Sequence, residues 1–206
     1  MNYIELLNHR FACKIFDENK TISADNEHII LEAARLSPSS FGLEPWKLLV
    51  IKNKELRERL KPACWNQNQI TQSQFLVIFL SRNAQNFRGQ TDYVKEKVSR
   101  KKLPQEMQDG YLNMIGNFMM GVETTEWAKR QCYIALSNML NAAKSIEIDS
   151  CPIEGFSPED VTKILRENTT INLDDFNVCV MAAFGYANMQ QPPKFRAKKE
   201  DIIQII

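Results

Sequence analysis

The sequence predicts an α+β fold, a three-layer α/β sandwich with more helix than strand. Segments with helical periodicity separate three apolar runs of strand length, which are Trp46–Ile51, Phe75–Leu80 and Val178–Phe184. The 206 residues contain no internal repeat and no low-complexity tract, and we expect one domain over residues 1–206. A chain of this length can bury about 70% of its unfolded surface.

The first half of the chain predicts helices around two of the strands. A short amphipathic helix is expected at Tyr3–Asn8, because Ile4, Leu7 and Phe11 recur at helical spacing. Ser23 is a suitable N-cap for a helix that runs to about Leu36, with an inner face of Ile29, Ile30, Ala33, Ala34 and Leu36. The charged segment Lys54–Lys61 predicts a solvated helix. The run Phe75–Leu80 has no polar face, which indicates a central strand buried on both sides.

The second half begins with a polar segment, residues 83–121, that we interpret as mobile helices and as a candidate lid. It carries a basic cluster interpreted as a solvated helix face, composed of Lys95, Lys97, Arg100, Lys101 and Lys102. Trp127–Ile146 predicts a long helix that is apolar or small nearly all round and therefore buried on most sides, at the centre or at a subunit interface. Ser157 and Pro158 start another helix. The tail from about residue 187 predicts an arm that leaves its own domain.

Composition and motifs exclude several function classes. The formal charge of +1 argues against a nucleic-acid partner, and no apolar run is long enough to cross a bilayer. The N-terminus lacks the apolar region of a signal peptide, and the five scattered cysteines are typical of reduced thiols, so we expect a cytoplasmic protein. Clustered Cys or His ligands for zinc are absent, as are the glycine-rich phosphate loops and the nucleophile elbow.

A loop at residues 36–51, LSPSSFGLEPWKLLVI, is the most informative segment. Its two serines follow a proline and precede a strand. They can donate hydrogen bonds to a bound ligand, or the segment can be an ordinary connecting loop. The other candidates lie in separate segments, and alone each is weak, since basic residues are mostly exposed surface charges. They are Arg10 and Lys14, Asn66 and Gln69, the turn Pro152–Gly155, and Lys194 and Arg196.

Together and in this order, these segments resemble the FMN-dependent nitroreductase family over nearly the whole chain. HRFACKIFD is similar to its N-terminal basic motif, LSPSSFGLEPWKLLVI to its serine loop and WNQNQI to its amide segment. EWAKRQCYIALSNMLNAA resembles the central helix, CPIEGF the flavin-edge turn, and FGYAN with PPKFR the last strand and basic tail.

The resemblance implies an intertwined homodimer with a mainly antiparallel central sheet flanked by helices and with FMN at the subunit interface. It implies hydride transfer from NADPH or NADH through FMN to a nitroaromatic, quinone or flavin acceptor. Arg10, Lys194 and Arg196 would hold the phosphate, and Lys14, Asn66 and Gln69 the pyrimidine end of the ring. Pro38, Ser39 and Ser40 would come from the partner subunit. The N–H groups of Glu154 and Gly155, in the turn with Pro152 and Ile153, would face N5 and O4.

Three positions depart from the common family pattern. Phe11 and Ala12 of the N-terminal motif replace a frequent His-Ser, Gly42 replaces an asparagine, and Gln69 replaces a lysine of some members. These changes bear on the affinity for FMN and on the redox potential of the flavin. The sequence nominates no catalytic acid, base or nucleophile, because the cofactor carries the chemistry. Two alternatives stay open, an FMN storage or sensing module without turnover and a helical interaction protein that binds through its Met-rich middle segment.

Overall fold

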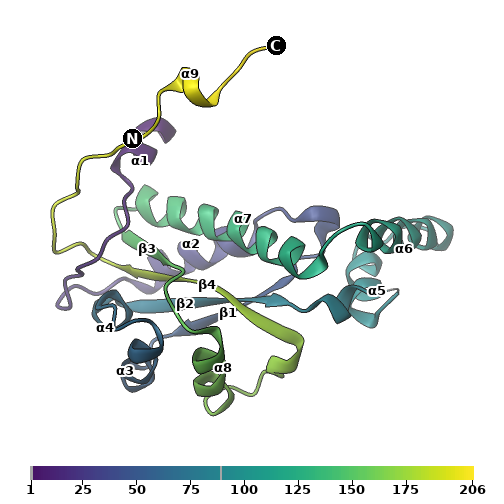
Figure 1. Ribbon diagram of the computed structural model, residues 1–206, viewed down its shortest axis with the longest axis horizontal. Helices are drawn as coiled ribbons and strands as arrows, with labels where there is room; N and C mark the ends of the chain where they lie inside the picture. The colour runs from purple at the N-terminus through teal and green to yellow at the C-terminus, as the bar shows by residue number, and fades with distance from the viewer. Residues whose placement is uncertain (1, 89) are drawn as a thin grey trace.

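The computed structural model describes residues 2–88 and 90–206, and in it a single antiparallel sheet is the central layer (Figure 1). The sheet has the order β1-β2-β4-β3, with every neighbouring pair antiparallel. The strands are β1 (Trp46–Ile51), β2 (Phe75–Arg82), β3 (Asp149–Ile153) and β4 (Phe176–Gly185). The predicted α+β class and antiparallel sheet are confirmed. We missed β3 as a strand, because its five residues include Asp149, Ser150 and Pro152 and show no apolar run.

Helices cover both faces of this sheet. α2 (Ala24–Arg35) and α7 (Thr124–Ser145) pack on one face, and α3 (Lys54–Ala63), α4 (Gln69–Gln72) and α8 (Pro158–Arg166) lie on the other (Figure 1). Ser23 caps α2 and Ser157 caps α8, both by accepting a backbone N–H, as predicted. α1 (Tyr3–His9) begins at a capping box between Asn2 and Glu5 and lies near the end of α7.

The central strand β2 is buried on both faces, as predicted. Its side chains alternate, with Leu76, Ile78 and Leu80 in the core under α3 and α8, and Phe75, Val77 and Phe79 in the core under α2 and α7. In β4 the alternation changes at a bulge, because Phe79 pairs with Val180 whereas Leu80 pairs with Val178. Cys179 is the extra residue, half-buried beside α7.

Some residues assigned to inner helix faces are exposed in the single chain. In α2, Ile30 and Ala34 are fully buried, but Ile29 and Leu36 are exposed. In α1 only Leu6 is buried, whereas Ile4 is exposed and Leu7 is half-buried. The long helix α7 is buried on most sides, as expected, yet Tyr133 and Ile134 are each 40% exposed. A helical period locates an apolar stripe, but it does not say whether the same chain covers it.

The segment at residues 83–121, apart from Gly89, which lies outside the described residues, forms helices that extend one end of the molecule (Figure 1). They are η2 (Ala84–Phe87), α5 (Asp92–Ser99) and α6 (Gln105–Met120), and with the start of α7 they enclose a third apolar cluster. Its mobility and its role as a lid stay predictions. One residue of its basic cluster does not fit a solvated face, because the Lys97 side chain is only 10% exposed.

The C-terminal arm runs away from the sheet beyond residue 187 and carries α9 (Lys199–Ile202) (Figure 1). Two further short turns are η1 (Ser40–Gly42) and η3 (Leu173–Asp175). No helix in the described part of the chain is long and apolar enough to cross a membrane. Within the same residues, His, Cys, Asp and Glu side chains form no cluster suited to a metal ion.

Candidate functional site

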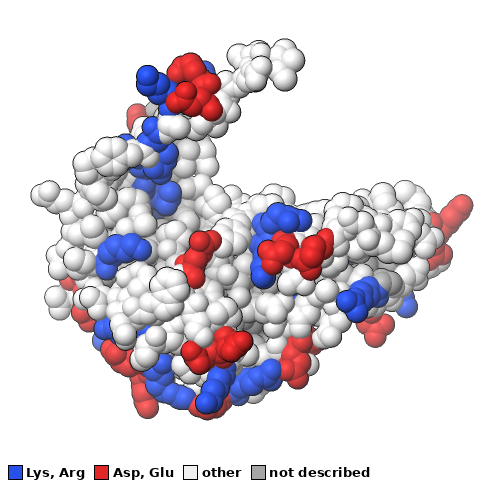
Figure 2. Space-filling model, in the orientation of Figure 1, with Lys and Arg blue, Asp and Glu red and all other residues white. Residues whose placement is uncertain are grey.

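A basic cavity lies where the segment after α1 meets the C-terminal arm. It has a volume of about 340 Å³, and its walls include Arg10, Phe11, Ala12, Pro152, Lys194 and Arg196. Six predicted site residues from three distant segments therefore share one cavity. Figure 2 shows Lys and Arg side chains gathered around α1, whereas the rest of that face mixes both signs.

Lys194 holds the arm to the N-terminal segment. Its ammonium donates to the Leu7 carbonyl, the last turn of α1, and to the Arg10 carbonyl at 2.7 Å. Burial, then the neighbouring charges of Arg10 and Arg196, lower the pKa of Lys194. No carboxylate among residues 2–88 and 90–206 lies within 4.0 Å of any of these three cations. Three mutually repelling cations without a counter-ion make a site suited to an anion.

A larger cavity of about 690 Å³ adjoins the basic one, since Arg10 and Pro152 line both. Its other walls are mainly apolar and come from α1, α7 and β4, including Leu7, Leu136 and Val180. Its volume falls in the range of about 300–1,000 Å³ that is usual for small-molecule sites. The Tyr133 hydroxyl on α7 donates to the Glu154 carboxylate across this cavity. Burial, and then that hydrogen bond, raise the pKa of Tyr133.

Lys14, Gln69 and Cys151 meet at the middle of β3. The Lys14 Nζ atom lies 3.3 Å from the Cys151 Sγ atom, and the Gln69 Nε2 atom lies 3.8 Å from the same sulfur. Gln69 is 3% exposed, although we expected it only as a ligand contact, and Lys14 forms no ion pair with Asp17. Burial raises the pKa of Cys151, against a smaller opposite effect of Lys14.

A strained turn at Trp65 and Asn66 faces Gly155. Both residues have a φ of 55°, in the left-handed region that is costly for residues other than glycine. The Trp65 side chain is 70% exposed. A Cβ atom on Gly155 would lie only 2.7 Å from the Trp65 ring. The Gln67 Nε2 atom donates to the Gly155 carbonyl at 2.8 Å, and the Gly155 N–H has no acceptor among the described residues.

The serine loop lies apart from these cavities. Ser39 accepts the Glu44 N–H at 2.8 Å, and the Ser40 N–H donates to the Gln131 side chain on α7 at 3.0 Å. Neither serine, nor Pro38, lines either cavity. The chain thus brings together the residues near α1, β3 and the arm, and it does not bring the serine loop to their cavities. Pro152 and Ile153 were expected in a turn, but they end strand β3, so that only Glu154 and Gly155 are outside regular structure.

Sequence reasoning missed three residues of this region. Tyr133 was assigned to a buried helix face, Gln67 was passed over between two other amides, and Cys151 was treated only as a buried thiol. Cys151 could have been found, because the alternation of β3 places it on the same side as Ile153. Gln67 and Tyr133 depend on contacts across 88 and 21 residues, which no local pattern contains.

Comparison with known proteins identifies the family of the chain. Residues 7–186 match the sequence profile described as "Nitroreductase family". The chain belongs to the nitroreductase family. It is 39% identical over 98% of its length to the protein named "Putative NAD(P)H nitroreductase YfkO" from Bacillus subtilis, with 96% of that protein covered. A relative from Staphylococcus haemolyticus, also named as an NAD(P)H nitroreductase of putative function, is 41% identical over 98% of the chain and 96% of its own length.

Solved structures of nitroreductases share the fold at low identity. One from Exiguobacterium sibiricum, described as a putative nitroreductase in complex with FMN, has a TM-score of 0.81 at 22% identity. The match covers all of this chain and 98% of that one. The predicted family resemblance and nitroreductase-like fold are therefore confirmed.

Proposed function

We propose that this nitroreductase is an NAD(P)H-dependent oxidoreductase that uses bound FMN to reduce nitroaromatic, quinone or flavin acceptors. The observation that carries the proposal is the convergence of Arg10, Lys194 and Arg196 on one cavity, with no carboxylate partner in the described part of the chain. A phosphate monoester is the anion that such a site fits, because guanidinium groups bind its oxygens in pairs. The FMN complex of a structural neighbour supports this cofactor, and the names of the relatives support NAD(P)H as the electron donor.

The residues of the site fit the rest of FMN as well. The unpaired Gly155 N–H and the Lys14 ammonium are donors suited to ring nitrogen and oxygen atoms, and we assign Asn66 and Gln69 to the same end. When bound, FMN would supply the two-electron chemistry between NADPH or NADH and the acceptor. Lys14 would stabilise negative charge at the pyrimidine end of the ring. Glu154, held by Tyr133, would fix the edge of the turn.

We also propose a homodimer in which Pro38, Ser39 and Ser40 complete the partner's FMN site. Their distance from the chain's own cavities supports this arrangement, as do the exposed apolar residues that a partner would cover. These include Ile29, Leu36, Ile134, Phe195 and Ile203. A cytoplasmic location agrees with the five free cysteines among the described residues.

Anaerobic titration tests the proposed function. The purified protein should carry a flavin absorbance band that NADPH or NADH bleaches within seconds and that a quinone or nitroaromatic compound restores. A protein with the band but no bleaching by either nucleotide would instead store or sense FMN. A colourless protein that does not bind added FMN would refute the proposal. Light scattering of the same sample should give twice the chain mass of 23.8 kDa.

A further inference from the structure

The serine loop has a backbone that needs external support. Phe41, Gly42 and Glu44 have φ values of 58°, 69° and 45°, all in the left-handed region. For residues with a side chain this conformation costs about 1–2 kcal/mol each, so it persists only where neighbouring groups fix it. Only Gly42 adopts it without that penalty.

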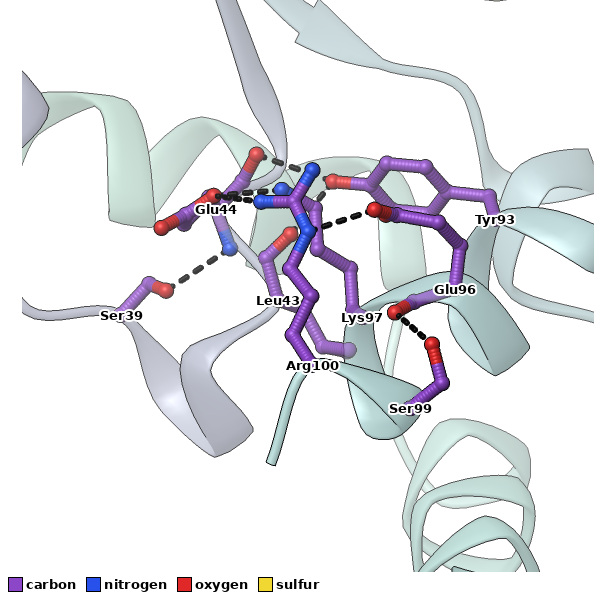
Figure 3. Close-up of polar contacts among 8 residues, drawn as sticks. All are labelled: Ser39, Leu43, Glu44, Tyr93, Glu96, Lys97, Ser99 and Arg100. Atoms are coloured by element: carbon purple, nitrogen blue, oxygen red, sulfur yellow. Dashed lines mark hydrogen bonds and ion pairs between the residues drawn. The ribbon is translucent and has the colours of Figure 1, made fainter. Parts of the chain in front are cut away.

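Glu44 is the centre of the contacts that fix the loop (Figure 3). Its N–H donates to the Ser39 hydroxyl oxygen at 2.8 Å, and its carbonyl accepts the Tyr93 hydroxyl at 2.9 Å. Its carboxylate binds the Lys97 ammonium and lies 3.5 Å from the Arg100 guanidinium. The Glu44 N–H is thus bonded to a serine of the loop, whereas its carbonyl and its carboxylate are bonded to another element.

That other element is helix α5, which belongs to the segment at 83–121. Tyr93, Lys97 and the C-cap residue Arg100 are spaced by four and three residues, so they lie on one side of α5, and this side is directed at the loop (Figure 3). Leu43 adds an apolar contact, because it is fully buried among Val94, Val98 and other residues of the third cluster. Lys97 is the most buried charge of this group, at 10% exposure.

We propose that Glu44 and Lys97 are positioning residues for the flavin. By holding the strained loop, they place Ser39 and Ser40 where the two hydroxyls can bind FMN. Ser39 accepts a hydrogen bond from Glu44 and keeps its own hydroxyl hydrogen free to donate. Helix α5 thus supports the conformation of the serine loop, and a substitution in α5 alters the affinity for FMN. This inference rests on the proposed FMN function.

Substitution of Lys97 tests the inference with two measurements. In Lys97→Gln we expect the Kd for FMN, measured by quenching of free FMN fluorescence, to rise about five- to tenfold, since a loss of about 1–1.4 kcal/mol corresponds to that factor. Lys97→Arg keeps the charge and should stay within about twofold of the wild type. Amide hydrogen exchange of the flavin-free protein should accelerate in the peptide at residues 39–46 of Lys97→Gln.

The matched control is Glu167→Gln, which breaks the exposed ion pair with Arg59 on the opposite side of the sheet and should change neither measurement. If Lys97→Gln does not fold, Tyr93→Phe removes only the hydroxyl and should give the same two changes. Wild-type FMN affinity in either folded variant overturns the inference, as does unchanged exchange at 39–46. A wild type that does not bind FMN refutes the proposed function itself, and the exchange measurement then decides alone whether α5 braces the loop.

Discussion

Gly155, which we propose faces the flavin, is closely packed against its own chain. A Cβ atom at this position would lie 2.7 Å from the Trp65 Cε3 atom and 3.0 Å from the Gln67 Nε2 atom. Trp65 is exposed and can move outward, but Gln67 is held by the carbonyls of Gly155 and Cys64 at 2.8 and 3.1 Å. Overpacking costs about 1–3 kcal/mol, and the exposed neighbour places Gly155→Ala near about 1–2 kcal/mol.

Thermal unfolding of the flavin-free protein measures this cost. One kcal/mol lowers the Tm of a domain this size by about 2–4 °C, so Gly155→Ala should melt about 2–8 °C below the wild type. Trp65→Ala removes the ring, and the double variant should recover at least about 0.5 kcal/mol relative to additivity. Gly110→Ala is the control, because a Cβ atom there meets nothing within 4 Å and lies inside α6, where alanine stabilises a helix.

The result that refutes the packing argument is a Gly155→Ala variant that melts with the wild type, with strictly additive effects in the double variant. The FMN affinity of the double variant separates the two roles of the glycine. If both stability and FMN binding recover, a glycine is needed at 155 only because the Trp65 ring occupies the space beside it. Recovered stability with lost FMN binding means that the ligand itself needs the space beside Gly155.

Three further outcomes are expected. Lys14→Ala should make the flavin midpoint potential more negative by tens of millivolts, since about 1 kcal/mol corresponds to roughly 20 mV for two electrons; an unchanged potential with FMN bound contradicts the role of Lys14. Arg10→Gln should weaken FMN but not riboflavin, which lacks the phosphate; equal losses for both would place the phosphate elsewhere. Burial raises the pKa of Cys13 to about 11 and of Cys64 to about 12, from 9.0. Above pH 9 the unfolded chain loses these protons before the native state does, so urea denaturation should show stability falling between pH 9 and 11 and not between pH 7 and 8.5.

The sequence predicted the elements whose residues contact near neighbours in the chain. The caps at Ser23 and Ser157 and the two-faced strand at Phe75 are local patterns, and each appears in the structure. The strand β3 escaped prediction because its pairing with β4 compensates for two polar residues and a proline. The exposed residues Ile29 and Leu36 escaped for the opposite reason, since their pattern is apolar while the chain itself leaves them uncovered.

For the candidate site, the family resemblance indicated which segments would contribute residues. The contacts between those residues came only from the structure. Arg10 and Lys194 are 184 residues apart, and only the folded chain shows that the lysine ammonium binds the arginine carbonyl. The role given to Lys97 changed most. Its sequence context is a run of lysines typical of a solvated surface, but Glu44, 53 residues earlier, draws its side chain inward.

The order of strands in the sheet has a consequence for synthesis of the chain. Strand β2 is almost uncharged and apolar on both faces, which makes it prone to aggregate until both neighbours pair with it. β1 precedes it, but β4 follows about a hundred residues later, so at about 5–20 residues per second its second edge waits roughly 5–20 s. During that interval the nascent chain exposes this aggregation-prone strand. A chaperone that shields Phe75–Leu80 on the ribosome would therefore raise the yield of folded protein.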